Sequence, residues 1–323
     1  MSEQESYKVA VISGGLMHER DVSLRSGRRL ARALQSGGHE TLVLDLDAHL
    51  IERLAEFEPD AVWPMIHGSE GEDGSLQDLL LMAGYRVVGT RPEGCRIATA
   101  KPVAKAVVAK NGLRTPASVT LPQSLFQRMG AEVILSLVET NFEYPVVVKP
   151  TVGGSALGIS LVHGSEALRN AMVNAFAYGS EVLVERYIAG RELAVSIIAD
   201  PQVSGGEAPG FRALPIVEIR SEGGYDFDAR YNTGRAIFYA PAPLTEQEVE
   251  AATGFALACH RVLELDDYSR IDVILDTEGA PWFIDSNVVP GMTDTSLFPQ
   301  AAAEDAGFEV VVDGVLRCSL ARQ

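Results

Sequence analysis

The chain has 323 residues, more than one hydrophobic core usually organises, so we expect two or three domains. Its 46% hydrophobic and 22% charged residues are typical of a soluble globular protein, and a formal net charge of −17 argues against nucleic acid and anionic membrane as partners. An acidic N-terminus, no apolar run long enough to span a membrane, and three dispersed cysteines predict a cytoplasmic protein with reduced thiols.

Strand and helix signals alternate over the first ninety residues. Strands are predicted at 7–13, 41–46 and 61–65, and helices at 21–35 and 75–83, with Ser75 able to cap the second. This alternation predicts a doubly wound α/β domain with a parallel sheet, whose ligands lie beyond the carboxyl ends of the strands. The loops there are SGGLMHER and HGSEGEDG. SGGLMHER lacks the third glycine of G-x-G-x-x-G, and its Glu19 would repel a pyrophosphate, which argues against a dinucleotide-binding dehydrogenase.

The middle of the chain carries a glycine-rich loop. A helix at 102–110 leaves Lys101 at its start, 112–123 is predicted to be a linker, and a helix at 131–139 precedes a strand at 145–149. The loop TVGGSALG follows Lys149, so backbone N–H groups, the lysine charge and the Ser155 hydroxyl could surround a phosphate. Taken alone, such a loop is as readily a structural turn between strands.

The C-terminal part contains the most specific pattern, in RIDVILDTEGAPWFIDSNVVPG. A turn at TEG predicts a hairpin in which Asp272 faces Asp285 and Arg270 faces Asn287. The two-residue period predicts the other face to hold Ile271, Val273, Trp282 and Ile284. Opposed carboxylates destabilise a strand pair unless a cation such as Mg²⁺ lies between them. A solvated hairpin edge, with Arg270 neutralising one carboxylate, is the alternative.

The remaining segments are simpler. Strand periodicity at 181–188 and 191–200 is followed by a polar loop at 221–234, a helix at 246–262, and helices near 296–305 and 310–320.

Four segments, taken in order, resemble the D-alanine–D-alanine ligases of the ATP-grasp superfamily. They are SGGLMHERDVSLRSG, HGSEGEDGSLQ, KPTVGGSALGIS, and RIDVILD with DSNVVPGMTDTSLFP. The resemblance implies an α/β protein with an ATP-grasp fold and an N-terminal doubly wound parallel-sheet domain. Its implied domains are an N-terminal substrate domain (1–92), a small central domain (93–185) and a C-terminal domain with the hairpin (186–323), with ATP between the last two.

The resemblance also implies a site and a reaction. ATP phosphorylates the first D-alanine's carboxylate, and the second D-alanine's amine attacks the acyl phosphate, as in peptidoglycan precursor synthesis. The implied ATP-binding residues are Lys101, Lys149, Gly153, Gly154, Ser155, Glu185, Arg186, Ile188, Glu192 and Arg230. Asp272, Asp285 and Asn287 would hold Mg²⁺ or Mn²⁺, as two ions.

Substrate and catalytic roles follow from the same resemblance. Arg270 and the Gly291 N–H would bind the tetrahedral oxyanion, and Glu19 would hold the first ammonium with Ser155 and Tyr231 as its partners. His67 matches a residue near the first substrate, and Ser296 and Leu297 match positions that hold the second carboxylate at a helix start. Tyr231 favours an amine over D-lactate as nucleophile. The family also implies a homodimer.

Several residues depart from the family pattern. Asp285 stands where Glu is usual, Ala100 where Asp is usual and Ala156 where Ser is common, and Val288 and Val289 replace smaller or polar residues beside the acceptor site. Two alternatives therefore accompany the ligase prediction. One is a related ATP-grasp ligase that joins other amino acids, and the other is a nucleotide-binding protein that no longer catalyses.

Overall fold

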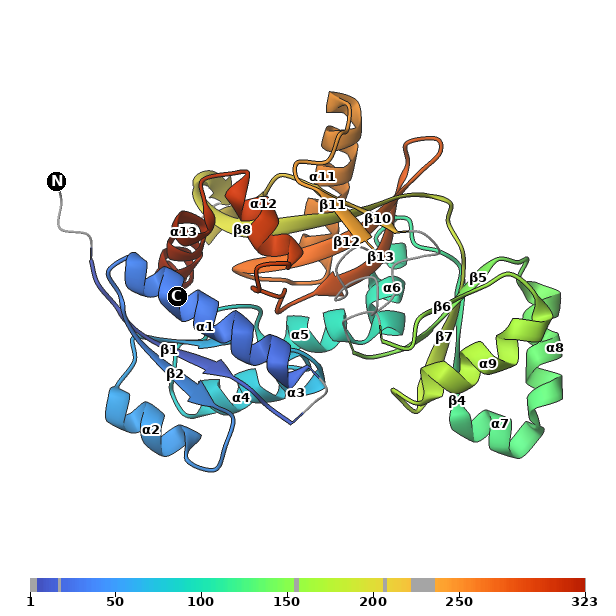
Figure 1. The fold of residues 1–323 in the computed structure, drawn as a ribbon, viewed down its shortest axis with the longest axis horizontal. Helices are drawn as coiled ribbons and strands as arrows, with labels where there is room; N and C mark the ends of the chain where they lie inside the picture. Colours follow the sequence, from blue (N-terminus) through green and yellow to red (C-terminus); the bar gives the residue numbers. More distant parts are fainter. Residues whose placement is uncertain (1–4, 17–18, 154–156, 206–207, 222–235, 323) are drawn as a thin grey trace.

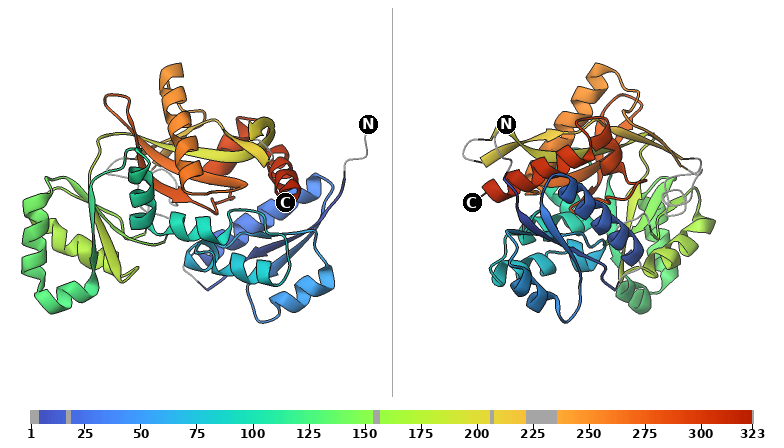
Figure 2. Two further views of the ribbon diagram at one scale, coloured as in Figure 1. Left: turned by 180° about the vertical axis from the view of Figure 1, so that it is seen from behind. Right: turned by 60° about the vertical axis from the view of Figure 1, so that its left-hand side comes forward.

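The computed structural model describes residues 5–16, 19–153, 157–205, 208–221 and 236–322. Within these ranges the chain forms three sheets, each with helices packed against it (Figures 1 and 2). In Figure 1 the N-terminal sheet lies at the lower left, the C-terminal sheet above it, and the central sheet at the right. No helix in the described ranges is long and apolar enough to cross a membrane.

The N-terminal sheet is parallel, with strand order β2-β1-β3, which confirms the parallel sheet predicted from the alternating pattern. Its elements are β1 (Lys8–Ser13), α1 (Arg20–Ser36), β2 (Glu40–Asp45), α2 (Leu50–Phe57), β3 (Ala61–Pro64), α3 (Ser69–Glu72) and α4 (Ser75–Met82). The four apolar residues 9–12 of β1 are fully buried, as expected for a parallel strand covered on both faces.

One prediction in this region was wrong. Ser75 does not cap α4, because Gly74 occupies the N-cap with φ of 88° and Ser75 is the first helical residue. The backbone N–H of Ser75 instead donates to Asp73 Oδ1 at 2.8 Å. A left-handed backbone at the cap position suits glycine better than serine.

The central sheet is antiparallel, with order β4-β7-β5-β6. The elements of this region are α5 (Pro92–Thr99), α6 (Lys101–Lys110), β4 (Ser118–Pro122), α7 (Gln123–Met129), α8 (Ala131–Asn141), β5 (Val146–Pro150), β6 (Ser160–Val162), α9 (Ser165–Phe176) and β7 (Glu181–Arg186). The linker predicted at 112–123 was wrong in part, since it contains β4. This strand lies at a sheet edge, where a terminal proline costs no ladder hydrogen bond.

The C-terminal sheet has the order β11-β10-β8-β12-β13, and β9 also pairs with β8. Its elements are β8 (Gly190–Gly205), β9 (Ala208–Ala213), β10 (Val217–Ser221), β11 (Ala236–Tyr239), α11 (Glu246–Val262), β12 (Tyr268–Asp276), β13 (Pro281–Asn287), α12 (Leu297–Ala303) and α13 (Phe308–Ala321). Helix α11 begins at a capping box, in which Thr245 and Glu248 satisfy each other's backbone N–H groups.

The hydrophobic cores do not follow the three sheets one to one. Residues of the N-terminal and C-terminal sheets share one buried cluster, in which Trp63 Nε1 donates to the Tyr268 hydroxyl at 2.9 Å. The central sheet has a separate cluster built on Val146, Val148 and Val184. The predicted domain boundaries stay a prediction, although the N-terminal and C-terminal sheets are packed together as one body.

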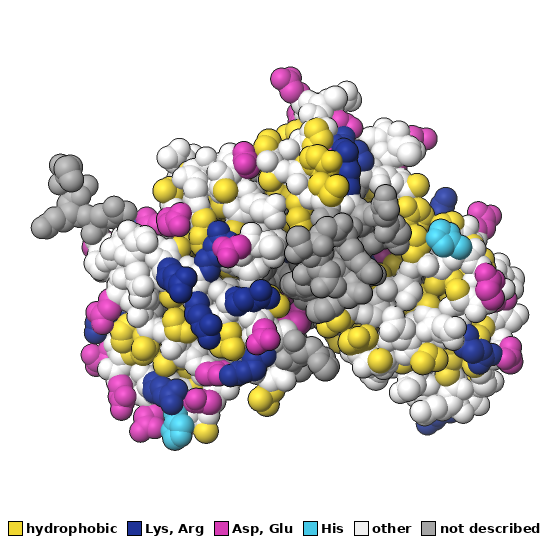
Figure 3. All heavy atoms as spheres, viewed as in Figure 1, with side chains coloured by type: hydrophobic (Ala, Val, Ile, Leu, Met, Phe, Trp, Pro, Cys, Tyr) yellow, Lys and Arg dark blue, Asp and Glu magenta, His cyan; other side chains and the backbone are white. Residues whose placement is uncertain are grey.

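The net charge is unevenly distributed over the surface. Figure 3 shows Lys and Arg side chains gathered over α1, a helix whose sequence holds five arginines. Of these, Arg25, Arg28 and Arg32 are exposed. The overall negative charge therefore does not describe every face of the molecule.

Candidate active site

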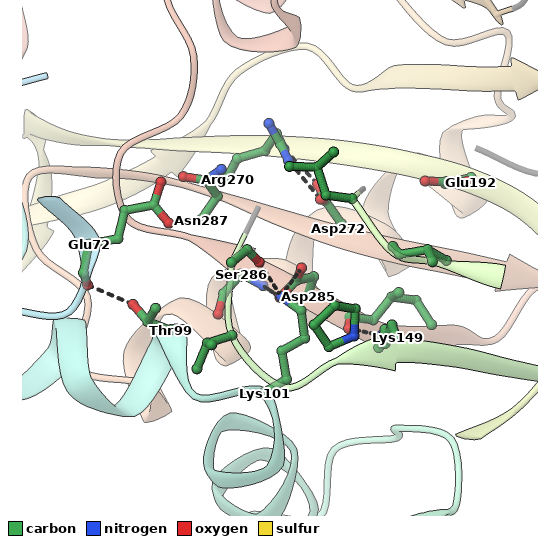
Figure 4. Close-up of a pocket in the computed structure, with 16 residues that line it drawn as sticks. Glu72, Thr99, Lys101, Lys149, Glu192, Arg270, Asp272, Asp285, Ser286 and Asn287 are labelled. Atoms are coloured by element: carbon green, nitrogen blue, oxygen red, sulfur yellow. Dashed lines mark hydrogen bonds and ion pairs between the residues drawn. The ribbon is translucent and has the colours of Figure 1, made fainter. Parts of the chain in front are cut away.

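A pocket lies where the central sheet meets the C-terminal sheet (Figure 4). Its lining draws on α6, β5 and the loop after it, β8, β12 and β13. The predicted site residues that line it are Lys101, Lys149, Gly153, Glu192, Arg270, Asp272, Asp285 and Asn287. Residues up to 215 positions apart in the chain, Glu72 and Asn287, are thus brought to one cavity, where charged groups of both signs face each other (Figure 4).

The hairpin register agrees with the prediction at the residues that matter most. Asp272 pairs with Asp285, and Arg270 pairs with Asn287. The prediction for the opposite face was wrong for β13. A β-bulge follows Asp272, so Val273 pairs with Phe283, which is buried, and Ile284 lines the pocket instead. Because β13 has one extra residue at the bulge, its side chains between the turn and the bulge point to the sheet face opposite to the predicted one.

Each hairpin carboxylate is held by a cation. Lys101 Nζ lies 2.7 Å from Asp285 Oδ2 and also donates to the Gly153 carbonyl at 3.0 Å. Arg270 binds Asp272 through two parallel bonds of 2.6 and 2.8 Å. Burial would raise the pKa of Asp285, but Lys101 and Lys149 hold that pKa below its usual value. Asp285 is therefore an ionised acceptor.

A second ionic cluster lies behind the pocket wall. Glu185 accepts from Lys149 at 2.6 Å through one oxygen and from Lys105 at 2.8 Å through the other. Burial opposes the charge on Glu185, yet the two lysines lower its pKa. Lys149 also donates to the Ile284 carbonyl at 3.2 Å. Glu185, predicted to contact adenine or ribose, thus binds two lysines.

Lys105 was missed in the sequence. It follows Lys101 by four residues on α6, which places both lysines on one helix face, and this spacing is the signal that could have found it. Its ammonium also donates to Thr115 Oγ1 at 2.9 Å, and Thr115 in turn donates to the Phe283 carbonyl at 3.0 Å.

The N-terminal loops supply the other end of the site. Glu19, His67 and Glu72 are all buried. His67 Nδ1 lies 2.9 Å from the Val289 carbonyl, and Nε2 lies 3.0 Å from Ser26 Oγ. Because a carbonyl can only accept, Nδ1 carries the proton in the neutral imidazole, and the serine hydroxyl donates to Nε2. His67 thereby joins the HGSEGEDG loop to the segment that follows the hairpin.

Glu72 was also missed, although it lies within HGSEGEDG. It lines the pocket, and burial, followed by the charge of Glu19, raises its pKa to about 8. One backbone N–H, from Gly68, donates to Oε1 at 3.2 Å and opposes this shift. At neutral pH this carboxyl group is mostly protonated.

The predicted acceptor end lies at the start of α12. Ser296 is the N-cap residue and Leu297 is buried. A Cβ on Gly291 would come within 2.7 Å of Ser296 Oγ, so only glycine fits this approach without a shift. Val288 and Val289 are buried in the shared core and do not line the pocket.

Several other predicted residues in the described ranges do not line this pocket: Glu19, His67, Glu185, Gly291, Ser296 and Leu297. Arg186 is exposed and Ile188 half-buried, and neither lines the pocket. Gly154, Ser155, Arg230 and Tyr231 lie outside the described residues.

The hairpin oxygens fit a divalent cation in type and placement. Carboxylates and an amide oxygen are ligands that Mg²⁺ accepts, and the register puts Asp272 opposite Asp285 with Asn287 two residues on. No group of three or more His, Cys, Asp or Glu side chains suited to a metal occurs in the described part of the chain. A metal here would thus rely on few protein ligands and would need Lys101 or Arg270 to release its partner.

Comparisons with known proteins give one consistent result. A family model described as "D-ala D-ala ligase C-terminus" matches residues 107–316. A D-alanine–D-alanine ligase of Geobacter sulfurreducens is 35% identical over 97% of this chain and 94% of its own. One from Bordetella petrii is 34% identical over 91% of this chain and 86% of its own. The structure of a Bacillus anthracis D-alanine–D-alanine ligase complexed with ATP superposes with a TM-score of 0.78, at 25% identity over 98% of both chains.

Proposed function

Since this chain belongs to the D-alanine–D-alanine ligase family, we propose that the pocket between its central and C-terminal sheets joins two D-alanines with ATP. The chain is an ATP-dependent ligase with the ATP-grasp fold. The observation that supports this pocket is the meeting of Lys101, Lys149 and Arg270 with the paired hairpin carboxylates. The dipeptide product serves peptidoglycan precursor synthesis.

The chemistry needs two steps. A carboxylate oxygen of the first D-alanine attacks the γ-phosphorus of ATP, and ADP leaves. The amine of the second D-alanine then attacks the acyl carbon and loses a proton. The bond from this carbon to the phosphorylated oxygen breaks, and inorganic phosphate leaves with that oxygen, which came from the first D-alanine's carboxylate. A carboxylate is a poor electrophile, so phosphorylation first gives it a leaving group. Such transfers depend mainly on positioning and charge neutralisation.

The phosphate end would be formed by Lys101 and Lys149. Lys101 Nζ contacts both Asp285 on the hairpin and the Gly153 carbonyl at the start of the glycine-rich loop. A phosphate bound by that loop would therefore lie close to the Lys101 ammonium. Lys149 stays charged because Glu185 and Asp285 outweigh its burial and raise its pKa. Mg²⁺ or Mn²⁺, held by Asp272, Asp285 and Asn287, would neutralise the charge of the phosphate oxygens.

The amino-acid end would be formed by the N-terminal loops and the start of α12. Glu19 would bind the first ammonium, and His67 would hold the loop that carries the first substrate. Arg270 and the Gly291 N–H would stabilise the tetrahedral oxyanion, and a donor of this kind is worth about 2.7–4 kcal/mol. Ser296 and Leu297 would meet the second carboxylate. The roles assigned to Ser155, Arg230 and Tyr231 stay predictions, as do a homodimer and a cytoplasmic location.

A second candidate is a related ligase that joins other amino acids. It was motivated by Val288 and Val289 next to the acceptor site. Both are buried in the core, and like Gly291, Ser296 and Leu297 they do not line the pocket, so the choice between the two candidates rests on substrate preference. Asp285 remains the departure within the pocket itself.

The test is phosphate release from ATP with Mg²⁺ and D-alanine, repeated with L-alanine, D-serine and D-lactate. We expect release with D-alanine to exceed the others, and mass spectrometry to identify the dipeptide. ATP without an amino acid is the control. Phosphate release with another acceptor but none with D-alanine would support the second candidate. No phosphate release with any of these compounds would contradict both candidates.

A further inference from the structure

The buried cluster behind the pocket contains more positive than negative charge. Lys105, Lys149 and Glu185 are almost completely buried, with side chains 3–4% exposed. The single negative charge of Glu185 is shared between two ammonium groups, one on each carboxylate oxygen. Lys149 lines the pocket, whereas Lys105 does not.

The charge balance of the pocket makes this excess significant. Lys101 is paired with Asp285 and Arg270 with Asp272, so each of these cations has a carboxylate of its own. Glu192 adds a further carboxylate to the lining, whereas Glu72 is mostly protonated at neutral pH. Without Lys105, Lys149 would be matched one to one with Glu185. Among the described residues, the carboxylates Asp272, Asp285, Glu185 and Glu192 would then outnumber the cations Lys101, Lys149 and Arg270.

We propose that Lys105 is a positioning residue for ATP. Lys105 binds one oxygen of Glu185 while Lys149 binds the other, and this leaves the charge of Lys149 available to the polyphosphate. This rests on the proposed function, because it assigns a role to a residue that would not touch the nucleotide. In a site screened from water, one unit of charge acts over a longer range than it would at the surface. The charge of Lys105 therefore attracts a bound polyphosphate, although Lys105 does not line the pocket.

The contacts of Lys105 hold it in this position. Its ammonium is shared between Glu185 on β7 and Thr115, whose hydroxyl binds the Phe283 carbonyl on β13. Lys105 thus connects the two sheets between which ATP would lie. Burial lowers its pKa, while the charge of Glu185 opposes that shift.

The experiment measures dissociation constants of ATP, ADP and AMP by titration calorimetry with excess Mg²⁺. The variants are Lys105→Met, the double variant Lys105→Met/Glu185→Gln, and the control Lys110→Met. Lys110 lies on the same helix but is exposed, so its replacement changes the same charge away from the cluster. The readout is the ratio of the ATP to the AMP dissociation constant, which cancels any effect on the adenosine part.

We expect Lys105→Met to weaken ATP binding about tenfold, which corresponds to about 1.4 kcal/mol, with a smaller loss for ADP and little for AMP. The double variant restores the excess charge, so its ratio should return close to that of the wild type. In steady-state kinetics the KM for ATP should rise in Lys105→Met while kcat changes little. Lys110→Met should match the wild type in all of these.

Two results would overturn the inference. One is an equal loss for all three nucleotides in Lys105→Met, which a purely structural role predicts. The other is a double variant as weak as the single one. If Lys105→Met does not fold, Lys105→Gln, which removes the same charge but keeps a hydrogen-bond donor for Glu185, takes its place in the same comparison. A wild type that binds no ATP would overturn the proposed function as well, whereas normal ATP binding by Lys105→Met would overturn this inference alone.

Discussion

The two ends of the pocket neutralise buried carboxyl groups in different ways. At the phosphate end, Asp272, Asp285 and Glu185 each lie within 3 Å of a Lys or Arg nitrogen. At the amino-acid end, no Lys or Arg nitrogen in the described ranges forms an ion pair with Glu72, the imidazole of His67 lies 4.0 Å away, and a proton neutralises the group instead. Ion pairs can be exchanged for another cation, whereas a proton must leave the carboxyl group. The difference predicts metal-sensitive behaviour at one end and pH-sensitive behaviour at the other.

The largest expected effect comes from removing a hairpin carboxylate. Asp272→Asn should lower turnover by about a thousandfold or more, because it removes a proposed metal ligand and the bidentate partner of Arg270. Phosphate release measures turnover, and a melting curve shows whether the fold survives. Glu278→Gln, at the exposed turn of the same hairpin, is the control. Near-normal turnover would contradict the assignment of Asp272 as a metal ligand.

Lys101→Met tests whether the ion pairs at the phosphate end are exchangeable. Without Lys101, Asp285 loses its 2.7 Å partner and becomes available to a metal ion. We expect Mn²⁺ to bind about tenfold more tightly in the absence of nucleotide, measured by electron paramagnetic resonance of the free ion. Turnover should be lost, since a proposed phosphate ligand is gone. Unchanged Mn²⁺ affinity, with Lys110→Met as the matched control, would contradict the exchange.

Glu72→Gln tests the protonated end and should have the smallest effect. Because burial raises the pKa of Glu72 to about 8 from the usual 4.5, the folded state holds this proton more tightly than the unfolded state does. Folding stability should therefore fall as pH rises through this window. Glu72→Gln should flatten the decline, seen in melting temperatures at pH 5, 7 and 9. If the slope matches that of Glu56→Gln, an exposed control, the proton is not on Glu72.

The sequence predicted the parts of the site that depend on period and order. The two-residue period of a hairpin was enough to place Asp272 opposite Asp285. The β-bulge after Asp272 could not be predicted, because one extra residue leaves no mark in composition. The prediction therefore placed Trp282 and Ile284 on the wrong face of the sheet, although it identified both strands.

The missed residues share a different cause. Lys105 and Glu72 act through burial and through partners that are distant in the chain. The four-residue spacing from Lys101 marks the helix face of Lys105, but it does not reveal Glu185 as its partner. Glu185 reads as an ordinary strand residue until Lys105 and Lys149 are placed on its two oxygens. The edge strand β4 was hidden for a similar reason, since only its pairing with β7 distinguishes it from a linker.

The hydrogen bond from His67 to the Val289 carbonyl has a consequence for the synthesis of the chain. Its partners are 222 residues apart, and the Trp63–Tyr268 bond adds a second link across 205 residues. A nascent chain that has released only its N-terminal sheet lacks the segment on which this loop is supported. The HGSEGEDG loop therefore reaches its final geometry only after the hairpin and Val289 have emerged from the ribosome.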